Sequence, residues 1–455
     1  MHRRISGTYL CFHIFFTLAV GGHLYAQEQT ESMSLPNAIE QAEKAAVDWL
    51  QDRILPNEEI PNPTPLRRRM VQSYIVDQKN PAYRWIYHRS YTYDSALAAI
   101  ALTMMGNYQD AELIISALQR NMLPDGSMWF AYNTINDWPY AENSEGALIR
   151  SGALAWAGYA AAFYLRERIR ENPWFMEDDL LAGDVLKMAT EIGTYLLDQQ
   201  VDDPDDGRYG LVTGGWGNYQ LFVEQREIEE RSYLEKITWV SMEHNVDIYF
   251  LFRDLGTLTG DKQWGNAAIL VRQGLMRLWS QTHGQFFRGY RIETGIDTAL
   301  PLDGASWGSL FLHAVGNKRK SSRCLEEMED RFYHQGENSS GYRPYSDEPV
   351  YENAQVNAYH YPEAPDTRWK DIDIVWGEGS LGAAAAYARA DMDNKALRIL
   401  HEMQALERDG GFLYASAEIP YQFSTDPSVA STAWYIITCE ILKETDTSDL
   451  FWGRY

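Results

Sequence analysis

Two kinds of helical segment alternate along the chain, and they differ in where their apolar residues fall. In the first kind nearly every position is apolar or small, as in YDSALAAIALTMM at 93–105. In the second kind the apolar residues form one stripe at helical spacing, as in 36–54. A helix that is apolar on all sides must be buried on all sides, whereas a striped helix is buried on one side only. The first kind comprises 93–105, 151–165, 243–255, 303–315, 378–390 and 427–442, and the second comprises 36–54, 109–120, 179–199, 262–280, 321–333 and 395–406.

Short loops that combine glycine with aromatic residues follow most of the striped segments. These loops lie at 125–132, 206–210, 284–287, 341–342 and 409–412. A helix pair that recurs with such a loop is a repeat, and each repeat is covered only by its neighbours. Six buried helices inside six half-exposed ones close into a barrel. We therefore predict an all-α fold, an (α/α)6 toroid with short β-hairpin loops, as a single domain over residues 36–455.

Acidic residues open the third buried segment, which reads WVSMEHNVDIYFLF at 239–252. Glu243 and Asp247 are four residues apart, so a helix places them on one face, roughly 5–6 Å apart at Cβ. They also lie at the end of the helix where the dipole stabilises negative charge. The alternative is that both are capping or core-rim acids without a function.

The other buried segments open in a similar way. Their first residues include Tyr93-Asp94, Arg150, Asp303, Glu378 and Asp426. Aspartate is an ordinary N-cap, so Asp426 needs no function, and Asp303 is open to either interpretation. Glu243 and Glu378 are poor caps, and an unpaired charge among small or aromatic residues is costly. These two glutamates and Asp94 are the strongest functional candidates.

This combination of alternating helices, glycine–aromatic loops and acids at the buried helix starts resembles the six-hairpin glycosidase superfamily. The resemblance extends over nearly the whole chain after residue 35, but it identifies no particular family. It implies a cleft at the N-terminal ends of the inner helices, where saccharides bind and carboxylates from different helices act. Members of this superfamily hydrolyse glycosidic bonds, and others eliminate across uronates or epimerise sugars.

Hydrolysis of a glycoside requires one protonated carboxyl group and one ionised carboxylate. Crowded carboxyl groups beside aromatic walls acquire different pKa values, which supplies both forms. We assign Glu243 as general acid, Asp94 or Asp303 as general base, and Glu378 as the second candidate acid. A lyase or epimerase would instead use a residue such as Tyr93, Arg150, His244 or Tyr290 to move a proton at a sugar carbon. A glycan-binding protein without activity is the third possibility.

The cleft is also expected to contain residues that bind the sugar. Aromatic side chains at loops and helix starts can stack on sugar faces, although any single one can equally be a core residue. The candidate substrate-binding residues are Tyr93, Trp129, Trp138, Arg150, Trp216, His244, Asn245, Asp247, Tyr290, Trp307 and Trp376.

Composition and charge limit the kinds of molecule that the protein is expected to bind. The chain has 455 residues and a formal charge of −24, which argues against nucleic acid and against an anionic membrane surface. Residues 1–26 have the basic start, apolar centre and small-residue end of a signal peptide, and 27–35 form a polar leader. No later apolar run approaches the length of a membrane span, so we expect a soluble protein that is periplasmic or secreted.

Metal and cofactor motifs are weak in this sequence. The histidines after residue 26 are scattered without HExxH or CxxC spacing, so we predict no metal and no cofactor. Residues 377–382 match the G-x-G-x-x-G pattern of dinucleotide sites, but no series of alternating strands and helices surrounds them. We expect these glycines to allow close packing of the helix. Cys324 and Cys439 could form one disulfide.

Overall fold

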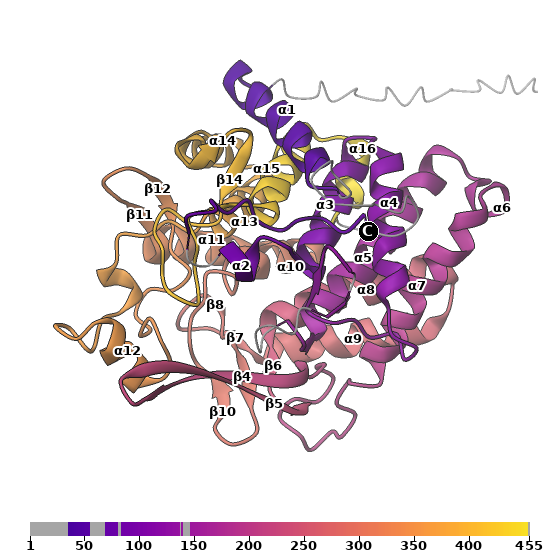
Figure 1. The fold of residues 1–455 in the computed structure, drawn as a ribbon. Helices are drawn as coiled ribbons and strands as arrows, with labels where there is room; N and C mark the ends of the chain where they lie inside the picture. The colour runs from indigo at the N-terminus through magenta and orange to yellow at the C-terminus, as the bar shows by residue number, and fades with distance from the viewer. Residues whose placement is uncertain (1–34, 55–68, 81–82, 137, 140–145, 454–455) are drawn as a thin grey trace, which may run out of the picture. The chain divides into compact units, whose positions relative to one another are not determined.

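The computed structural model describes residues 35–54, 69–80, 83–136, 138–139 and 146–453. The predicted signal peptide and all but the last residue of the predicted leader lie outside the described residues. Residues 33–455 form one compact unit. The described part of this unit consists mainly of helices, as Figure 1 shows.

Among the described residues, six helices are buried on nearly all sides and form an inner ring. Each packs against the next in chain order, and the last packs against the first, so the ring is closed. These inner helices are α3 (Thr92–Met104), α5 (Ser151–Glu171), α8 (Met242–Thr259), α10 (Ser306–Ala314), α13 (Gly377–Arg389) and α15 (Val429–Leu442). The predicted all-α (α/α)6 toroid is therefore confirmed.

Small residues allow the inner helices to pack closely. The run Ala383–Ala386 in α13 is fully buried, and alanine is the strongest helix former. A Cβ atom on Gly379 would lie 2.2 Å from the ring of Trp376, and one on Gly382 would lie 3.1 Å from Trp307. The glycines of the G-x-G-x-x-G match thus make room for two tryptophans.

A second set of helices surrounds the inner ring, and each of its members buries one face. In α14, for example, the buried residues Ala396, Ile399, Leu400 and Met403 follow helical spacing. The outer helices are α1 (Asn37–Asp52), α4 (Tyr108–Asn121), α7 (Leu180–Leu197), α9 (Lys262–Arg277), α11 (Lys318–Phe332) and α14 (Asp393–Met403). Shorter helices lie in the connections, namely α2 (Tyr83–Ile86), α6 (Phe175–Asp178), α12 (Ala354–His360), α16 (Asp446–Leu450), η1 (Trp369–Asp371) and η2 (Gln404–Leu406).

The first outer helix pairs with the last inner helix, which joins the two ends of the described chain. α1 packs against α15. Glu43 of α1 accepts a 2.6 Å hydrogen bond from Lys443, which also bonds Glu440 of α15 at 2.8 Å. This contact holds the sixth helix pair together although its two charged partners are 400 residues apart in sequence.

Aromatic residues from the C-terminal segment fill the centre of the ring. Trp452 stacks on Phe250 with ring centroids 4.6 Å apart, and it also contacts Trp156, Trp307 and Trp434. Trp452 is only 2% exposed. The barrel interior is therefore a packed aromatic core and not a channel.

Small antiparallel sheets connect many of the helices. The predicted β-hairpin loops are present, since the glycine–aromatic segments contribute β2, β8, β12 and β14. The strands are β1 (Arg89–Tyr91), β2 (Ala131–Asn133), β3 (Ile149–Arg150), β4 (Gly215–Glu224), β5 (Glu227–Ile237), β6 (Val240–Ser241), β7 (Trp279–Ser280), β8 (Gln285–Phe286), β9 (Gly289–Arg291), β10 (Gly295–Asp297), β11 (Tyr333–Gln335), β12 (Ser340–Tyr342), β13 (Glu407–Arg408), β14 (Gly411–Leu413) and β15 (Pro427–Ser428).

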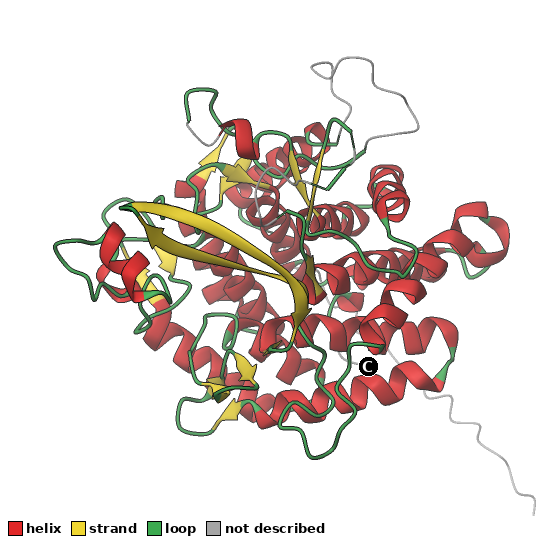
Figure 2. Cartoon of the chain, turned by 60° about the horizontal axis from the view of Figure 1, so that its bottom comes forward, coloured by secondary structure: helices red, strands yellow, loops and turns green. Residues whose placement is uncertain are grey.

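The β4–β5 hairpin is much longer than the others and was not predicted. Its turn consists of Gln225 and Arg226, which both have positive φ, so it is a two-residue turn without the Asn-Gly signature of such turns. Figure 2 shows the two strands as a curved ribbon across the helices. At one end of the hairpin, β4 pairs with β3, and β3 directly precedes α5. The other end packs on a second small apolar cluster that contains Val356 and Trp369.

Two further expectations need correction. Asp303 does not lie in a helix, because α10 begins at Ser306 and Asp303 lies in the preceding turn. Cys324 and Cys439 form no disulfide, since both are free and buried. No helix in the described ranges is long and apolar enough to cross a membrane.

We predict that Trp452→Ala lowers the free energy of unfolding by about 3–5 kcal/mol, because it removes the ring that fills the barrel centre. Denaturant titration followed by far-UV circular dichroism measures this change. The matched control is Trp174→Ala, whose side chain is 64% exposed and should have little effect. Equal stability of the two variants would show that the aromatic centre contributes no more than a surface tryptophan.

Candidate active site

A cavity of about 820 Å³ opens at the N-terminal ends of the inner helices. It receives residues from the starts of α3, α5, α8 and α13, from the turn before α10, and from the segment before α15. This position follows from the fold, because the ring places the first turns of its helices at one end. The cavity is hereafter called the main cavity.

Eight acidic residues line the main cavity. Glu230 lies in β5, and Glu418 and Asp426 lie in the segment before α15. The other five carboxyl groups lie at the starts of inner helices or in the turn before α10, and they are Asp94, Glu243, Asp247, Asp303 and Glu378. All except the half-buried Glu243 have at most 8% of their surface exposed. Glu243 and Asp247 both point into the cavity from α8, as their spacing of four residues predicts. Among the described residues, no lysine or arginine forms an ion pair with any of the five.

Burial raises the pKa of every one of these carboxyl groups. The pKa of Asp94 rises to about 7, although a hydrogen bond from Ser73 acts in the opposite direction. Burial alone raises the pKa of Glu243 to about 7. Burial and the nearby charges of Asp94 and Glu243 raise the pKa of Glu378 to about 8. The five groups cannot all be ionised at neutral pH, because charge on one opposes charge on its neighbours.

Asp247 and Asp303 are the most strongly affected. Burial raises the pKa of each well above its ordinary value, and the charge of Glu243 raises both further. The pKa of Asp303 is also raised by Glu378.

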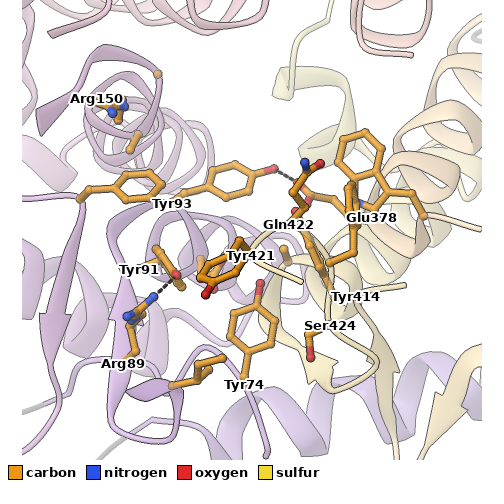
Figure 3. A pocket seen from close by; sticks show the side chains of 18 of the residues that line it. Tyr74, Arg89, Tyr91, Tyr93, Arg150, Glu378, Tyr414, Tyr421, Gln422 and Ser424 are labelled. Carbon is orange, nitrogen blue, oxygen red and sulfur yellow. Dashed lines mark hydrogen bonds between the residues drawn. The ribbon is translucent and has the colours of Figure 1, made fainter. Parts of the chain in front are cut away.

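Glu378 is held in place by a chain of hydrogen bonds. The Tyr93 hydroxyl donates to Glu378 Oε1 at 2.5 Å, and Trp434 Nε1 donates to the same hydroxyl at 3.0 Å. Figure 3 shows the Tyr93 hydroxyl directed at Glu378. By contrast, Asp94 Oδ2 and Asp247 Oδ1 are buried without a hydrogen-bond partner in the described structure. These oxygens are available to a bound hydroxyl group.

Aromatic rings form the floor and one wall of the main cavity. Trp156 and Trp307 lie at its floor with ring centroids 5.8 Å apart, and both rest on the central aromatic core. In the wall, Tyr74 packs edge-on against Tyr414, which stacks on Phe423. Figure 3 shows Tyr74, Tyr414 and Tyr421 around one side of the cavity. Such rings offer flat apolar surfaces beside the carboxyl groups.

His244 lies beside Glu243 in the wall of the main cavity. Burial and the charge of Arg150 lower its pKa to about 3, so the imidazole is neutral at physiological pH. Its Nδ1 atom is buried without a hydrogen-bond partner in the described structure. The ring lies so close to α5 that a Cβ atom on Gly152 would be 2.4 Å from His244 Cδ2. A glycine is therefore required at position 152.

A second cavity of about 260 Å³ adjoins the main one. Four residues line both cavities, and they are Trp239, Glu243, His244 and Asp303. Tyr290, Tyr345, Arg288 and Arg291 line only the second cavity. Glu378, Asp94 and Asp247 line only the main cavity.

The structure brings ten of the predicted site residues to the main cavity. They are Tyr93, Asp94, Arg150, Glu243, His244, Asp247, Asp303, Trp307, Trp376 and Glu378. Five others lie elsewhere. Tyr290 belongs to the second cavity, Trp129 packs against the core, and Trp138 and Trp216 are 71% and 40% exposed away from both cavities.

Asn245 is the fifth predicted residue outside the cavities, and its role is structural. It is fully buried, with its Oδ1 accepting from the backbone N–H of Val212 at 2.8 Å and its Nδ2 donating to the Val212 carbonyl at 3.0 Å. Asn245 therefore fixes the chain before β4 to the start of α8. It follows Glu243 by two residues, which turns it to a different face of the helix.

Sequence analysis missed several cavity residues in the connecting segments. They are Tyr74, Arg89, Tyr91, Phe130, Trp156, Tyr219, Glu230, Trp239, Tyr414 and the segment 418–424. Most lie outside the periodic segments, so no spacing rule places them at the mouth. Trp156 was assigned to the core, and it also forms part of the cavity floor. Within the described residues, no group of three or more His, Cys, Asp or Glu is arranged to hold a metal ion.

Comparison with known proteins identifies the fold. No protein-family model matches the chain, and no curated protein sequence does. A solved D-mannose isomerase matches with a TM-score of 0.58 at 10% identity, covering 90% of this chain and 100% of that one. A GH63 mannosylglycerate hydrolase from Thermus thermophilus, in complex with glucose, matches with a TM-score of 0.52 at 13% identity over 87% and 99% of the two chains.

A third solved structure is a GH76 alpha-mannanase from Bacteroides thetaiotaomicron, with a TM-score of 0.52 at 9% identity over 89% of this chain and 96% of that one. The chain thus shares the (α/α)6 toroid fold of these proteins, as its resemblance to the six-hairpin glycosidase superfamily led us to expect. Sequence identities this low establish a shared fold but not a shared activity. The activity of this chain must therefore be inferred from its site.

We predict that the free energy of unfolding decreases between about pH 5 and pH 8. Asp94, Glu243 and Glu378 have raised pKa values, so the folded chain binds their protons more tightly than the unfolded chain. This stabilisation is complete below the ordinary carboxyl pKa and is lost as the pH rises through 7 to 8. Each unit of raised pKa corresponds to about 1.4 kcal/mol.

Urea titrations at several pH values measure this slope, and Glu378→Gln should reduce it because an amide does not titrate. The exposed Glu363→Gln is the control and should retain the slope of the unmodified protein. If Glu378→Gln leaves the slope unchanged, the carboxyl group titrates as it would in water.

Proposed function

We propose that the protein is a glycoside hydrolase that cleaves a saccharide bound in the main cavity, with Glu243 and Glu378 as the paired carboxyl groups. One observation supports this most strongly. Two glutamates from the starts of α8 and α13 meet in one aromatic-walled cavity, without cationic partners in the described structure. Glycoside hydrolysis uses such a pair, one group to protonate the leaving oxygen and one to activate water or attack the sugar. The predicted signal peptide makes export part of the proposal.

Glu378 is assigned as the general base. Tyr93 donates a hydrogen bond to Glu378 Oε1, and a donated hydrogen bond stabilises the ionised form. The same bond fixes one carboxylate oxygen and leaves the other to accept a proton from water. This assignment replaces Asp94 or Asp303 as base, and it replaces the earlier role of Glu378 as second candidate acid. Asp303 is disfavoured because burial and the charges of Glu243 and Glu378 raise its pKa, and no hydrogen-bond donor in the described structure stabilises its ionised form.

Glu243 is assigned as the general acid. Burial raises its pKa to about 7, and no hydrogen bond or cation in the described structure stabilises its charge. The two pKa values alone, about 8 for Glu378 and about 7 for Glu243, favour the opposite roles. The contacts decide the assignment here, because only Glu378 is held by a donor to its charged form.

The other carboxyl groups are assigned to substrate binding. Asp94 Oδ2 and Asp247 Oδ1 are buried and unpartnered, so each can accept a hydrogen bond from a sugar hydroxyl. Trp239 and Trp376 line the cavity and are partly exposed, so their rings can stack on the apolar face of the sugar. These groups would orient the sugar between the two glutamates.

A sugar isomerase or epimerase is the second candidate, and His244 favours it. The imidazole is neutral, lies in the cavity wall, and has an unpartnered Nδ1 that could take a proton from a sugar carbon. A D-mannose isomerase and a sugar epimerase from a ruminal bacterium share this fold. In that case His244→Gln should abolish activity and both glutamates should be dispensable for proton transfer at carbon.

Replacing either glutamate should abolish most of the hydrolysis. We expect Glu243→Gln and Glu378→Gln each to lower kcat/KM by about 10²–10⁴-fold, since an amide can neither donate nor accept the required proton. Release of reducing sugar from a panel of oligosaccharides measures this loss. Glu363→Gln is the control. Full activity in both cavity variants would reject the proposed pair.

The leaving group separates the two roles. An aryl glycoside with an acidic phenol needs little protonation, so Glu243→Gln should retain much more activity on it than on an oligosaccharide. Glu378→Gln should lose activity on both substrates. The reverse pattern would exchange the acid and the base.

Tyr93→Phe should shift the pH dependence of hydrolysis. The hydrogen bond from Tyr93 lowers the pKa of Glu378, so its removal raises that pKa further. A base with a higher pKa is ionised only at higher pH, and the acid limb of the kcat/KM profile should therefore move to higher pH. Tyr233→Phe, on the exposed part of β5, is the matched control. A shift to lower pH would contradict the role of Glu378 as base.

A further inference from the structure

The second cavity adjoins the main cavity, and the reaction proposed above assigns no role to it. It lies beside the start of α8, and Trp239, Glu243, His244 and Asp303 form the boundary between the two spaces. Among the five carboxyl groups, only Glu243 and Asp303 reach both cavities. Glu378 lines the main cavity and not the second one.

We propose that the second cavity is the subsite for the leaving group, and that it accepts a single neutral polyhydroxylated unit such as one hexose. This inference rests on the proposed hydrolase function and specifies its substrate. The main cavity then holds the sugar whose anomeric carbon is attacked. The substrate would be a short saccharide that is cut one unit from its end.

The position of Glu243, the proposed general acid, supports the assignment of one sugar unit to each cavity. A general acid must reach the oxygen between the two sugar units, so it must lie where their subsites meet. Glu243 lies at that boundary. A base that activates water must lie on the far side of the attacked sugar, and Glu378 lines only the main cavity. The distribution of the two glutamates between the cavities thus matches their proposed roles.

The reaction balances with the residues that the cavities provide. The bond between the anomeric carbon and the bridging oxygen breaks, and its electron pair goes to that oxygen, which takes the proton of Glu243. A bond forms between the anomeric carbon and a water oxygen, and the water proton passes to Glu378. The leaving unit departs from the second cavity as a neutral alcohol, and no other reactant is consumed.

The size of the second cavity suits a leaving group of one unit. Sites for drug-sized ligands have volumes of roughly 300–1,000 Å³. The main cavity is within this range, whereas the second cavity, at about 260 Å³, is below it. Its volume therefore fits a single small unit.

Charge balance in the wall explains why the unit should be neutral. Arg288 donates to Asp297 Oδ2 at 2.9 and 2.7 Å, and Arg291 donates to the same oxygen at 3.0 Å. Both arginines also pair with Glu352. Two cations and two anions cancel in this cluster, which leaves no spare charge for an acidic leaving group. A carboxylate ligand would have to displace one of these ion pairs.

Tyr345 is the residue of the second cavity best placed to distinguish leaving groups. Burial and the charges of Asp303 and Glu243 raise its pKa, and a hydrogen bond with Arg288 acts in the opposite direction, so the phenol lies among these three groups. It lines the second cavity and not the main one. A hydroxyl group at this position can hydrogen-bond to the leaving unit close to the bridging oxygen.

The test compares two substrates that share one sugar and differ in the leaving group. One is the glycosyl fluoride of the sugar that the enzyme cleaves, whose fluoride ion needs no subsite. The other is the corresponding disaccharide. We expect Tyr345→Phe to lower kcat/KM for the disaccharide about tenfold, as the loss of one hydrogen bond of about 1.4 kcal/mol implies, and to leave the fluoride rate nearly unchanged. Tyr233→Phe should change neither rate.

Three results would overturn the inference or its premise. Equal losses on the two substrates would show that Tyr345 acts on the attacked sugar or on the fold. A preference of the unmodified enzyme for the same sugar linked to a carboxylate-bearing alcohol, such as glycerate, would reject a neutral leaving group. If the unmodified enzyme cleaves no member of a panel of glycosyl fluorides and disaccharides, the proposed hydrolase function itself fails.

Discussion

Burial of the inner helices on every side is the constraint on which this structure depends. A helix such as α5 has no polar face to turn to water, so it requires neighbours on both flanks and an outer helix behind it. An open row of such helices would leave its two end members exposed. Closure of α15 against α3, completed by α1, removes both exposed ends. The aromatic residues at the C-terminus then fill the space that closure leaves inside.

The same constraint determines where chemistry can occur. Charged residues deep inside the inner helices are paired, as Arg166 of α5 is with Asp254 of α8. The unpaired acidic residues lie at the helix starts, which the ring gathers at one end. There the dipole of each helix stabilises negative charge, while burial among aromatic rings opposes it. The carboxyl groups consequently have pKa values near or above neutrality, and a proton can be held or released by small changes in contact. Tyr93 supplies one such contact to Glu378, and Glu243 has none in the described structure.

Sequence patterns predicted the parts of the molecule that follow a strong periodicity. The toroid, the order of its helices and the shared face of Glu243 and Asp247 could be predicted because uniform apolar character and a spacing of four have a single structural meaning. The β4–β5 hairpin was missed, since both its faces contain polar residues and its turn is Gln225-Arg226. Trp138 and Trp216 were placed at the mouth from their position in loops, but loop position does not determine where a side chain points. Tyr74 and Tyr414 come from aperiodic segments and meet only through the tertiary fold.

The central claim is that water replaces a leaving group at an anomeric carbon within the main cavity. The most direct measurement is mass spectrometry of the products formed from an oligosaccharide panel in H₂¹⁸O, with a parallel reaction in D₂O. The account predicts cleavage with one ¹⁸O atom at the new reducing end, no deuterium on carbon, and loss of the signal in Glu243→Gln. Deuterium at a sugar carbon without cleavage would contradict hydrolysis and identify an isomerase or epimerase.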